Sequence, residues 1–112
     1  MPVKSNVVTI RVEEKPTFTV VIKSVRETIR GFRFSFPVTF NACIIDPMGG
    51  YRCKDYTTPY VFTLKTGYVL EVTVPARVIY AGMVLDFVAW DDGVTSRTRK
   101  FTFDAEVTAI YA

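Results

Sequence analysis

Apolar and polar residues alternate with a period of two along most of this chain, and no segment has the wider spacing of an amphipathic helix. This alternation is typical of β-strands that bury one face and expose the other. Many short strands separated by turn residues predict an all-β, immunoglobulin-like antiparallel β-sandwich of about 7–10 strands. The pattern places strands at 7–12, 18–22, 32–40, 51–56, 60–65, 68–74, 78–80, 83–90, 95–103 and 106–111.

The clearest of these patterns is at 32–40, where every second residue is large and apolar. The members are Phe32, Phe34, Phe36, Val38 and Phe40. Five such groups on one face predict a strand in the centre of the core, where complete burial contributes roughly 1.5–3 kcal/mol for each side chain. Pro37 has no N–H to donate, so this strand should lie at a sheet edge or carry a bulge there.

The first 14 residues differ from the rest because a polar break, Glu13-Glu14-Lys15-Pro16, follows their short strand. In that strand Val8, Ile10 and Val12 lie on one face. We therefore divide the chain into an N-terminal strand and linker, residues 1–14, and a sandwich domain, residues 15–112. The strand either begins the same domain or adds to the sheet edge of a neighbouring chain.

The two cysteines, Cys43 and Cys53, flank a turn whose composition is Asp-Pro-Met-Gly-Gly. A hairpin that pairs Ile45 with Tyr51 places the two cysteines directly opposite one another, at a separation compatible with a disulfide. A bridge here would imply an oxidising location or a hyperthermophile cell.

The same register also has an unfavourable consequence, so the sequence does not decide whether the disulfide forms. It sets the cations Arg52 and Lys54 against Ile44 and Ala42, unless a bulge near Asn41 changes which way the strand faces. The sequence therefore supports a bonded and an unbonded interpretation equally.

Asp92-Gly93 predicts a two-residue hairpin between the strands on either side of it. That register places Asp86 opposite Arg99, and Trp90 diagonal to Arg97. One interpretation is a cross-strand ion pair with an arginine packed on the indole ring. The other is that Trp90, Arg97 and Arg99 form a recognition patch for an acidic or nucleic-acid partner.

The strand at 83–90 is apolar on both faces, with Leu85 and Phe87 on one and Val88 and Trp90 on the other. In an antiparallel sheet, only one face usually packs against the core, and the other face is open to solvent. Either loops or a neighbouring strand cover the second face, or it is a contact between subunits, since exposed apolar patches usually mean association.

Composition limits the chemistry open to this chain. It has 112 residues, enough for one domain, and no histidine anywhere. That excludes Ser-His-Asp and Cys-His catalysis and zinc sites that need imidazole, so we expect no enzyme, no cofactor and no catalytic or metal-binding residue. No glutamine occurs either, a composition that fits a thermophile, where labile amides are avoided.

Targeting signals are also limited. The first residues lack the apolar core of a secretion signal, and no run is long enough for a membrane span. The formal net charge of +3 permits weak attraction to nucleic acid.

Several stretches resemble a known type of module. They are Phe87-Val88-Ala89-Trp90-Asp91-Asp92-Gly93, the downstream Arg97, and the final Thr108-Ala109-Ile110-Tyr111. Together they are similar to the divergent internalin-type repeat and related immunoglobulin-like modules of archaeal and bacterial surface proteins, over roughly the second half of the chain. The resemblance implies a β-sandwich or β-grasp-like module used for spacing, adhesion or assembly, with no catalytic residues.

These observations predict a non-enzymatic structural subunit of a virion, an extracellular filament or a cell surface. It would form a homo-oligomer or polymer through strand or apolar-patch contacts. Two alternatives stay open. One is a small basic β-protein, cytoplasmic in that case, that binds nucleic acid through Arg97, Arg99 and Lys100. The other is an adhesion module that binds a glycan or a protein through Trp90 and the loop tyrosines.

Overall fold

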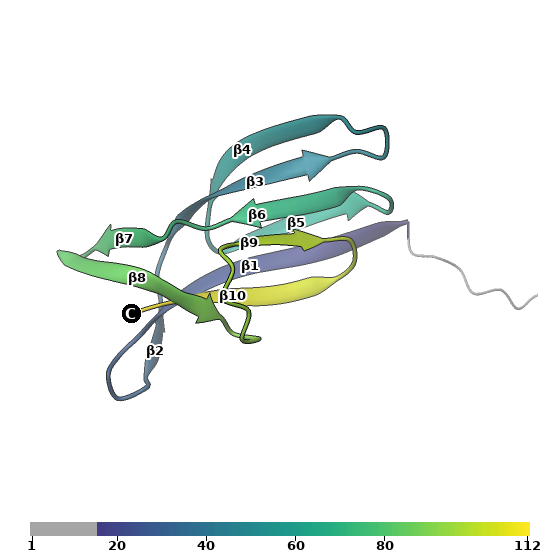
Figure 1. The fold of residues 1–112 in the computed structure, drawn as a ribbon. Helices are drawn as coiled ribbons and strands as arrows, with labels where there is room; N and C mark the ends of the chain where they lie inside the picture. The colour runs from purple at the N-terminus through teal and green to yellow at the C-terminus, as the bar shows by residue number, and fades with distance from the viewer. Residues whose placement is uncertain (1–15) are drawn as a thin grey trace, which may run out of the picture.

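The computed structural model describes residues 16–112, and that part of the chain contains ten β-strands and no helix (Figure 1). The strands are β1 (Thr17–Glu27), β2 (Arg33–Ser35), β3 (Thr39–Ile45), β4 (Tyr51–Thr57), β5 (Tyr60–Lys65), β6 (Val69–Thr73), β7 (Arg77–Tyr80), β8 (Met83–Trp90), β9 (Thr98–Phe101) and β10 (Ala105–Tyr111).

The strands form two sheets that pack as a sandwich. The first sheet has the order β2-β1-β10-β8-β7, and β5 also pairs with β1. The second sheet has the order β4-β3-β6-β9. All pairs are antiparallel except β1 with β10, which run parallel from Val20 beside Ala105 to Arg26 beside Tyr111. The all-β, immunoglobulin-like sandwich predicted from the alternation is therefore confirmed, with one parallel pair added.

The core lies between the inner faces of the two sheets. Strand β1 buries every second side chain, including Phe18, Val20 and Ile22. From the second sheet, β3 contributes Phe40 and β6 contributes Leu70, both with almost no exposed surface. The period of two seen in the sequence is thus the period of burial.

The prediction of one central strand at 32–40 was wrong. The first part is β2, in the first sheet, and the last residues begin β3, in the second sheet. Pro37 lies in the segment that crosses between them, where a missing N–H breaks no ladder. Phe36 is buried, but Phe32 and Phe34 are 61% and 57% exposed.

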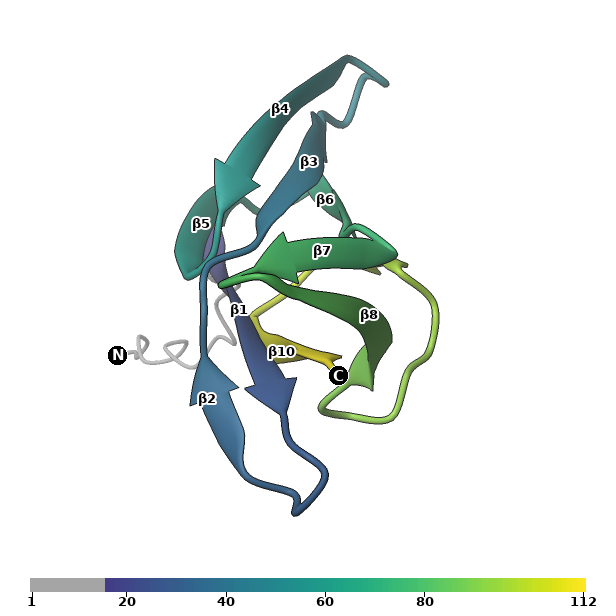
Figure 2. The same ribbon diagram turned by 90° about the vertical axis from the view of Figure 1, so that its left-hand side faces the viewer.

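Geometry explains the exposure of these two phenylalanines. The hairpin formed by β1 and β2 extends away from β3, β4 and β6, so strands of the second sheet do not lie over its end (Figure 2). The alternation of apolar and polar residues does not show where the second sheet ends.

Two buried hydroxyl groups hold the crossing segment in place. The Ser24 hydroxyl donates to the Phe36 carbonyl oxygen at 2.6 Å and lies 2.5 Å from Thr58 Oγ1. Thr58 Oγ1 in turn accepts a hydrogen bond from the Val38 N–H at 2.9 Å. These bonds satisfy backbone groups that have left one sheet and not yet joined the other.

The predicted hairpin at Asp92-Gly93 was also wrong. A tight turn is present, with the Gly93 N–H bonded to the Trp90 carbonyl oxygen at 2.9 Å. However, the chain then crosses to the second sheet, where β9 pairs with β6. Strand β8 pairs with β7 and β10, so Asp86 lies opposite Arg77 and not opposite Arg99.

Candidate interaction surfaces

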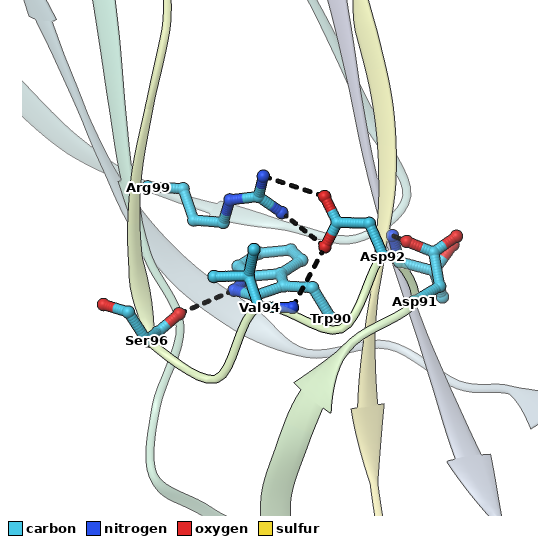
Figure 3. A network of polar contacts seen from close by, with 7 residues as sticks. Trp90, Asp91, Asp92, Val94, Ser96 and Arg99 are labelled. Carbon is cyan, nitrogen blue, oxygen red and sulfur yellow. Dashed lines mark hydrogen bonds and ion pairs between the residues drawn. The ribbon is translucent and has the colours of Figure 1, made fainter.

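The predicted patch around Trp90 is a buried cluster at the crossing between the sheets (Figure 3). Trp90 is only 1% exposed, and its indole N–H donates to the Ser96 carbonyl oxygen at 2.8 Å. The guanidinium carbon of Arg99 lies 5.6 Å from the centre of the Trp90 ring and 5.4 Å from that of Phe101. Trp90 therefore offers no flat aromatic surface to a partner.

Asp92 completes this cluster. Arg99 donates to both carboxylate oxygens of Asp92, at 3.0 and 2.9 Å, in the paired geometry that arginine and carboxylate favour. The hydrogen bonds from Arg99 hold the pKa of the Asp92 carboxyl below its usual range. Arg99 thus binds Asp92 and packs on two rings, whereas the sequence interpretation paired Arg99 with Asp86 and placed Arg97 beside the indole.

This lowered pKa predicts a pH dependence of stability. The pKa of Asp92 is lower in the folded chain than in the unfolded chain. Its ionised form therefore contributes fully to the free energy of unfolding above the unfolded pKa of about 3.9, and this contribution is lost as pH falls through the folded pKa. We expect Asp92→Asn to flatten the fall in unfolding free energy below about pH 4. Since the pair is partly exposed, the difference should be less than about 1 kcal/mol.

Urea unfolding at a series of pH values measures this effect. Asp91→Asn is the matched control, because Asp91 accepts a backbone hydrogen bond from Thr108 instead of binding Arg99. Equal acid slopes for Asp92→Asn and the wild type would contradict the prediction.

Arg97 is exposed, and one of its nitrogens donates to the Val74 carbonyl oxygen at 3.2 Å. Lys100 is exposed on the outer face of the second sheet, in register with Glu71. The structure thus does not bring Trp90, Arg97 and Arg99 to one accessible surface.

Cys43 and Cys53 form a disulfide between β3 and β4, with an S–S distance of 2.05 Å. The pairing of Ile45 with Tyr51 is present, and the register runs without a bulge through Asn41. The disulfide that the sequence left undecided is therefore formed.

The two cations that made this register look unfavourable lie on the edge strand, where they stay in contact with solvent. Arg52 and Lys54 share a face with Ile44 and Ala42, but β4 is the end strand of its sheet and both cations stay exposed. Figure 2 shows β4 projecting away from the strands of the first sheet. Because β4 is an edge strand, the two cations avoid the free-energy cost of burying a charge, which they would pay on a central strand.

Within residues 16–112, the outer face of strand β8 is exposed, and apolar side chains lie on it beside the ion pair of Asp86 with Arg77. Ile79 of β7 and Val84 of β8 are cross-strand neighbours, 76% and 57% exposed. Val88 is also half exposed. We name Ile79, Val84 and Val88 the β7–β8 patch.

Trp90 does not share this outer face, contrary to the sequence interpretation. The register between β8 and β10 shifts beside Ile110, leaving Val88 as an extra residue. This bulge turns Trp90 toward the core, where Leu85 also lies.

A second exposed apolar group lies on the hairpin of β1 and β2. Ile29 at its tip is fully exposed, and Phe32 and Phe34 follow on the returning side. We name Ile29, Phe32 and Phe34 the hairpin patch. Alternation identified Phe32 and Phe34 as apolar strand residues but placed them in the core, and no local signal in the sequence shows that they lie outside it.

A hollow of about 280 Å³ lies where β1 passes from its partner β5 to its partner β2. Its lining includes Lys23, Ser35 and Pro59, together with the Ser24 and Thr58 hydroxyls described above. Those hydroxyls already bond to each other and to the backbone, so the hollow presents no buried side-chain donor or acceptor without a partner.

The remaining candidates, Val8, Ile10 and Val12, lie outside the described residues. Among residues 16–112 there is no group of three or more Cys, Asp or Glu side chains placed to hold a metal ion. The same part of the chain has no helix long and apolar enough to cross a bilayer.

No protein-family model and no curated protein matches this chain. Among solved structures, the chain is similar to the pilus-presented adhesin Cpa, solved as a cysteine-to-alanine mutant, with 11% identity and a TM-score of 0.48. The match covers 87% of this chain and 27% of the adhesin, so the chain spans about a quarter of that protein's length.

Proposed function

We propose that this chain is a non-enzymatic structural subunit that self-associates into a polymer on a cell surface, an extracellular filament or a virion. One observation carries the proposal. The end strand β2 of the first sheet has a large exposed apolar side chain, Phe34, and a second one, Phe32, directly precedes it. A free sheet edge beside exposed apolar surface is a template for pairing with another chain.

The disulfide supports a location outside a reducing cytoplasm. Both cysteines of the sequence are used in the bridge, and Cys53 lies on an exposed edge strand. Disulfides persist in secreted, surface and virion proteins and are rare where cellular thiols are kept reduced.

The two alternative functions are less well supported by the geometry. Nucleic-acid binding by stacking on Trp90 would need an accessible indole ring, and Trp90 is buried beneath Arg99. Arg99 is itself bonded to Asp92. A glycan-binding role for Trp90 fails for the same reason, because a sugar ring also needs an open aromatic face.

Polymer formation by the purified full-length chain tests the proposal. We expect light scattering to rise with protein concentration and negative-stain microscopy to show elongated assemblies. Deletion of residues 1–14 should abolish both if the N-terminal strand joins the subunits. Wild-type protein that stays monomeric at every concentration and salt condition tested would contradict the proposed function.

A further inference from the structure

We infer that the free edge of β2, together with the hairpin patch, receives residues 7–12 from a second copy of this chain. The inference rests on the proposed function and names the surface through which the subunits would join.

The acceptor is an incomplete edge of the first sheet. Strand β2 pairs with β1 along Arg33–Ser35, and no other described strand pairs with its opposite side. Phe32, Phe34 and Phe36 alternate along this segment, so they lie on one face. Phe36 is buried against the Tyr111 ring, with ring centres 5.8 Å apart. The apolar stripe therefore starts in the core and continues into solvent, where an added strand would cover it.

Residues 7–12 match this edge in period and chemistry. Val8, Ile10 and Val12 alternate with Thr9 and Arg11, so a strand made from them presents one apolar face. Laid beside β2, that face would continue the layer begun by Phe36. Branched aliphatic side chains next to aromatic ones are among the favourable cross-strand pairs.

Charge selects the direction and register of the added strand. In an antiparallel arrangement that pairs Val12 with Phe34, Glu13 lies opposite Arg33, which already binds Glu27 of β1 at 2.9 Å and would then lie between two carboxylates. Glu14 then lies opposite Phe32, two positions from the exposed Arg30 at the hairpin tip. A shift by two residues would instead set Arg11 against Arg33, which places like charges opposite one another.

The positions of donor and acceptor favour pairing between chains in an open series. Residue 16 precedes the start of β1, whereas β2 pairs with the last residues of β1. Strand β1 has 11 residues, so these ends are separated by about 35 Å. Figure 1 shows the start of β1 and strand β2 at opposite ends of the molecule. A contact between unlike ends produces a filament when the rotation does not close.

Two full-length variants separate the donor from the acceptor. Ile10→Pro removes a donor N–H and disfavours strand pairing by residues 7–12. Phe32→Ser combined with Phe34→Ser removes the apolar side chains of the acceptor. We expect each variant alone to be monomeric, and an equimolar mixture to give a one-to-one dimer, because one chain offers only an acceptor and the other only a donor.

Ile79→Ser combined with Val84→Ser is the matched control, because it removes two comparably exposed apolar side chains from the β7–β8 patch. This control should polymerise like the wild type. All variants change exposed side chains or residues before β1, so each should keep the wild-type circular dichroism spectrum and melting temperature.

A synthetic peptide of residues 1–15 provides a direct binding measurement. It should bind the Ile10→Pro chain saturably, and at least tenfold more weakly when Phe32→Ser and Phe34→Ser are added. Equal binding to both, or weaker binding after the β7–β8 control changes, would overturn the inference.

Polymerisation distinguishes this inference from the proposed function. If the Phe32→Ser and Phe34→Ser chain polymerises like the wild type, the acceptor is wrong while the structural function stands. If the wild type stays monomeric and binds the peptide only after Ile10→Pro, residues 7–12 occupy the edge of their own chain. That result would overturn both the pairing between copies and the proposed function.

Discussion

Trp90→Ala should lower the free energy of unfolding by about 3–5 kcal/mol, the range observed when a large aromatic side chain is removed from a packed core. Trp90 is 1% exposed and packs edge-on against Phe87, with ring centres 6.0 Å apart. The change also leaves the Ser96 carbonyl oxygen without its donor and Arg99 without one of its two rings. Urea unfolding followed by circular dichroism measures the effect, since this chain has no second tryptophan to report fluorescence.

Trp90→Phe separates the packing contribution from the polar one. It keeps an aromatic ring in the core but removes the indole N–H, so we expect a smaller loss of about 1–2 kcal/mol. Val88→Ala is the control for the same strand, because Val88 is half exposed and should change stability by less than about 0.5 kcal/mol. A loss below about 1 kcal/mol for Trp90→Ala would show that the cluster at the sheet crossing does not stabilise the fold.

Local features of this fold could be predicted from the sequence because they depend on short separations along the chain. The register of β3 and β4 follows from counting residues around one turn, which sets Cys43 opposite Cys53. Most strand positions follow from the period of two, with the stretch at 32–40 as the exception. These arguments need no knowledge of the other layer.

The assignment of strands to sheets could not be predicted in this way. Val20 pairs with Ala105, 85 positions away, and nothing local to either residue encodes that contact. The segments after Phe34 and after Trp90 both cross between sheets, yet their alternation resembles that of continuous strands or hairpins. A crossing preserves the period while changing every hydrogen-bonding partner.

The candidate site could be predicted only in part, for a related reason. Trp90, Asp92 and Arg99 are in contact, but a one-residue bulge in β8 turns the indole ring into the core. A shift of one residue moves a side chain to the other face of a strand. Exposure of Phe32 and Phe34 likewise depends on where the second sheet ends, a property of the whole fold.

Replacing both cysteines, Cys43→Ala with Cys53→Ala, should lower the free energy of unfolding by about 2–3 kcal/mol. The bridge joins residues separated by ten positions, and a loop of that size restricts the unfolded chain by about this amount in the chain-entropy model. Chemical unfolding of the double variant, compared with the wild type with and without a thiol reductant, measures the effect.

The reductant provides the internal control for this prediction. It should destabilise the wild type and leave the double variant unchanged, because the variant has no thiol or disulfide left to react. Since the bridge lies on β3 and β4, in the second sheet, the variant should retain the first-sheet edges and polymerise at temperatures below its melting point. Equal unfolding free energies for the oxidised wild type and the double variant would show that hairpin pairing alone holds β4 in place.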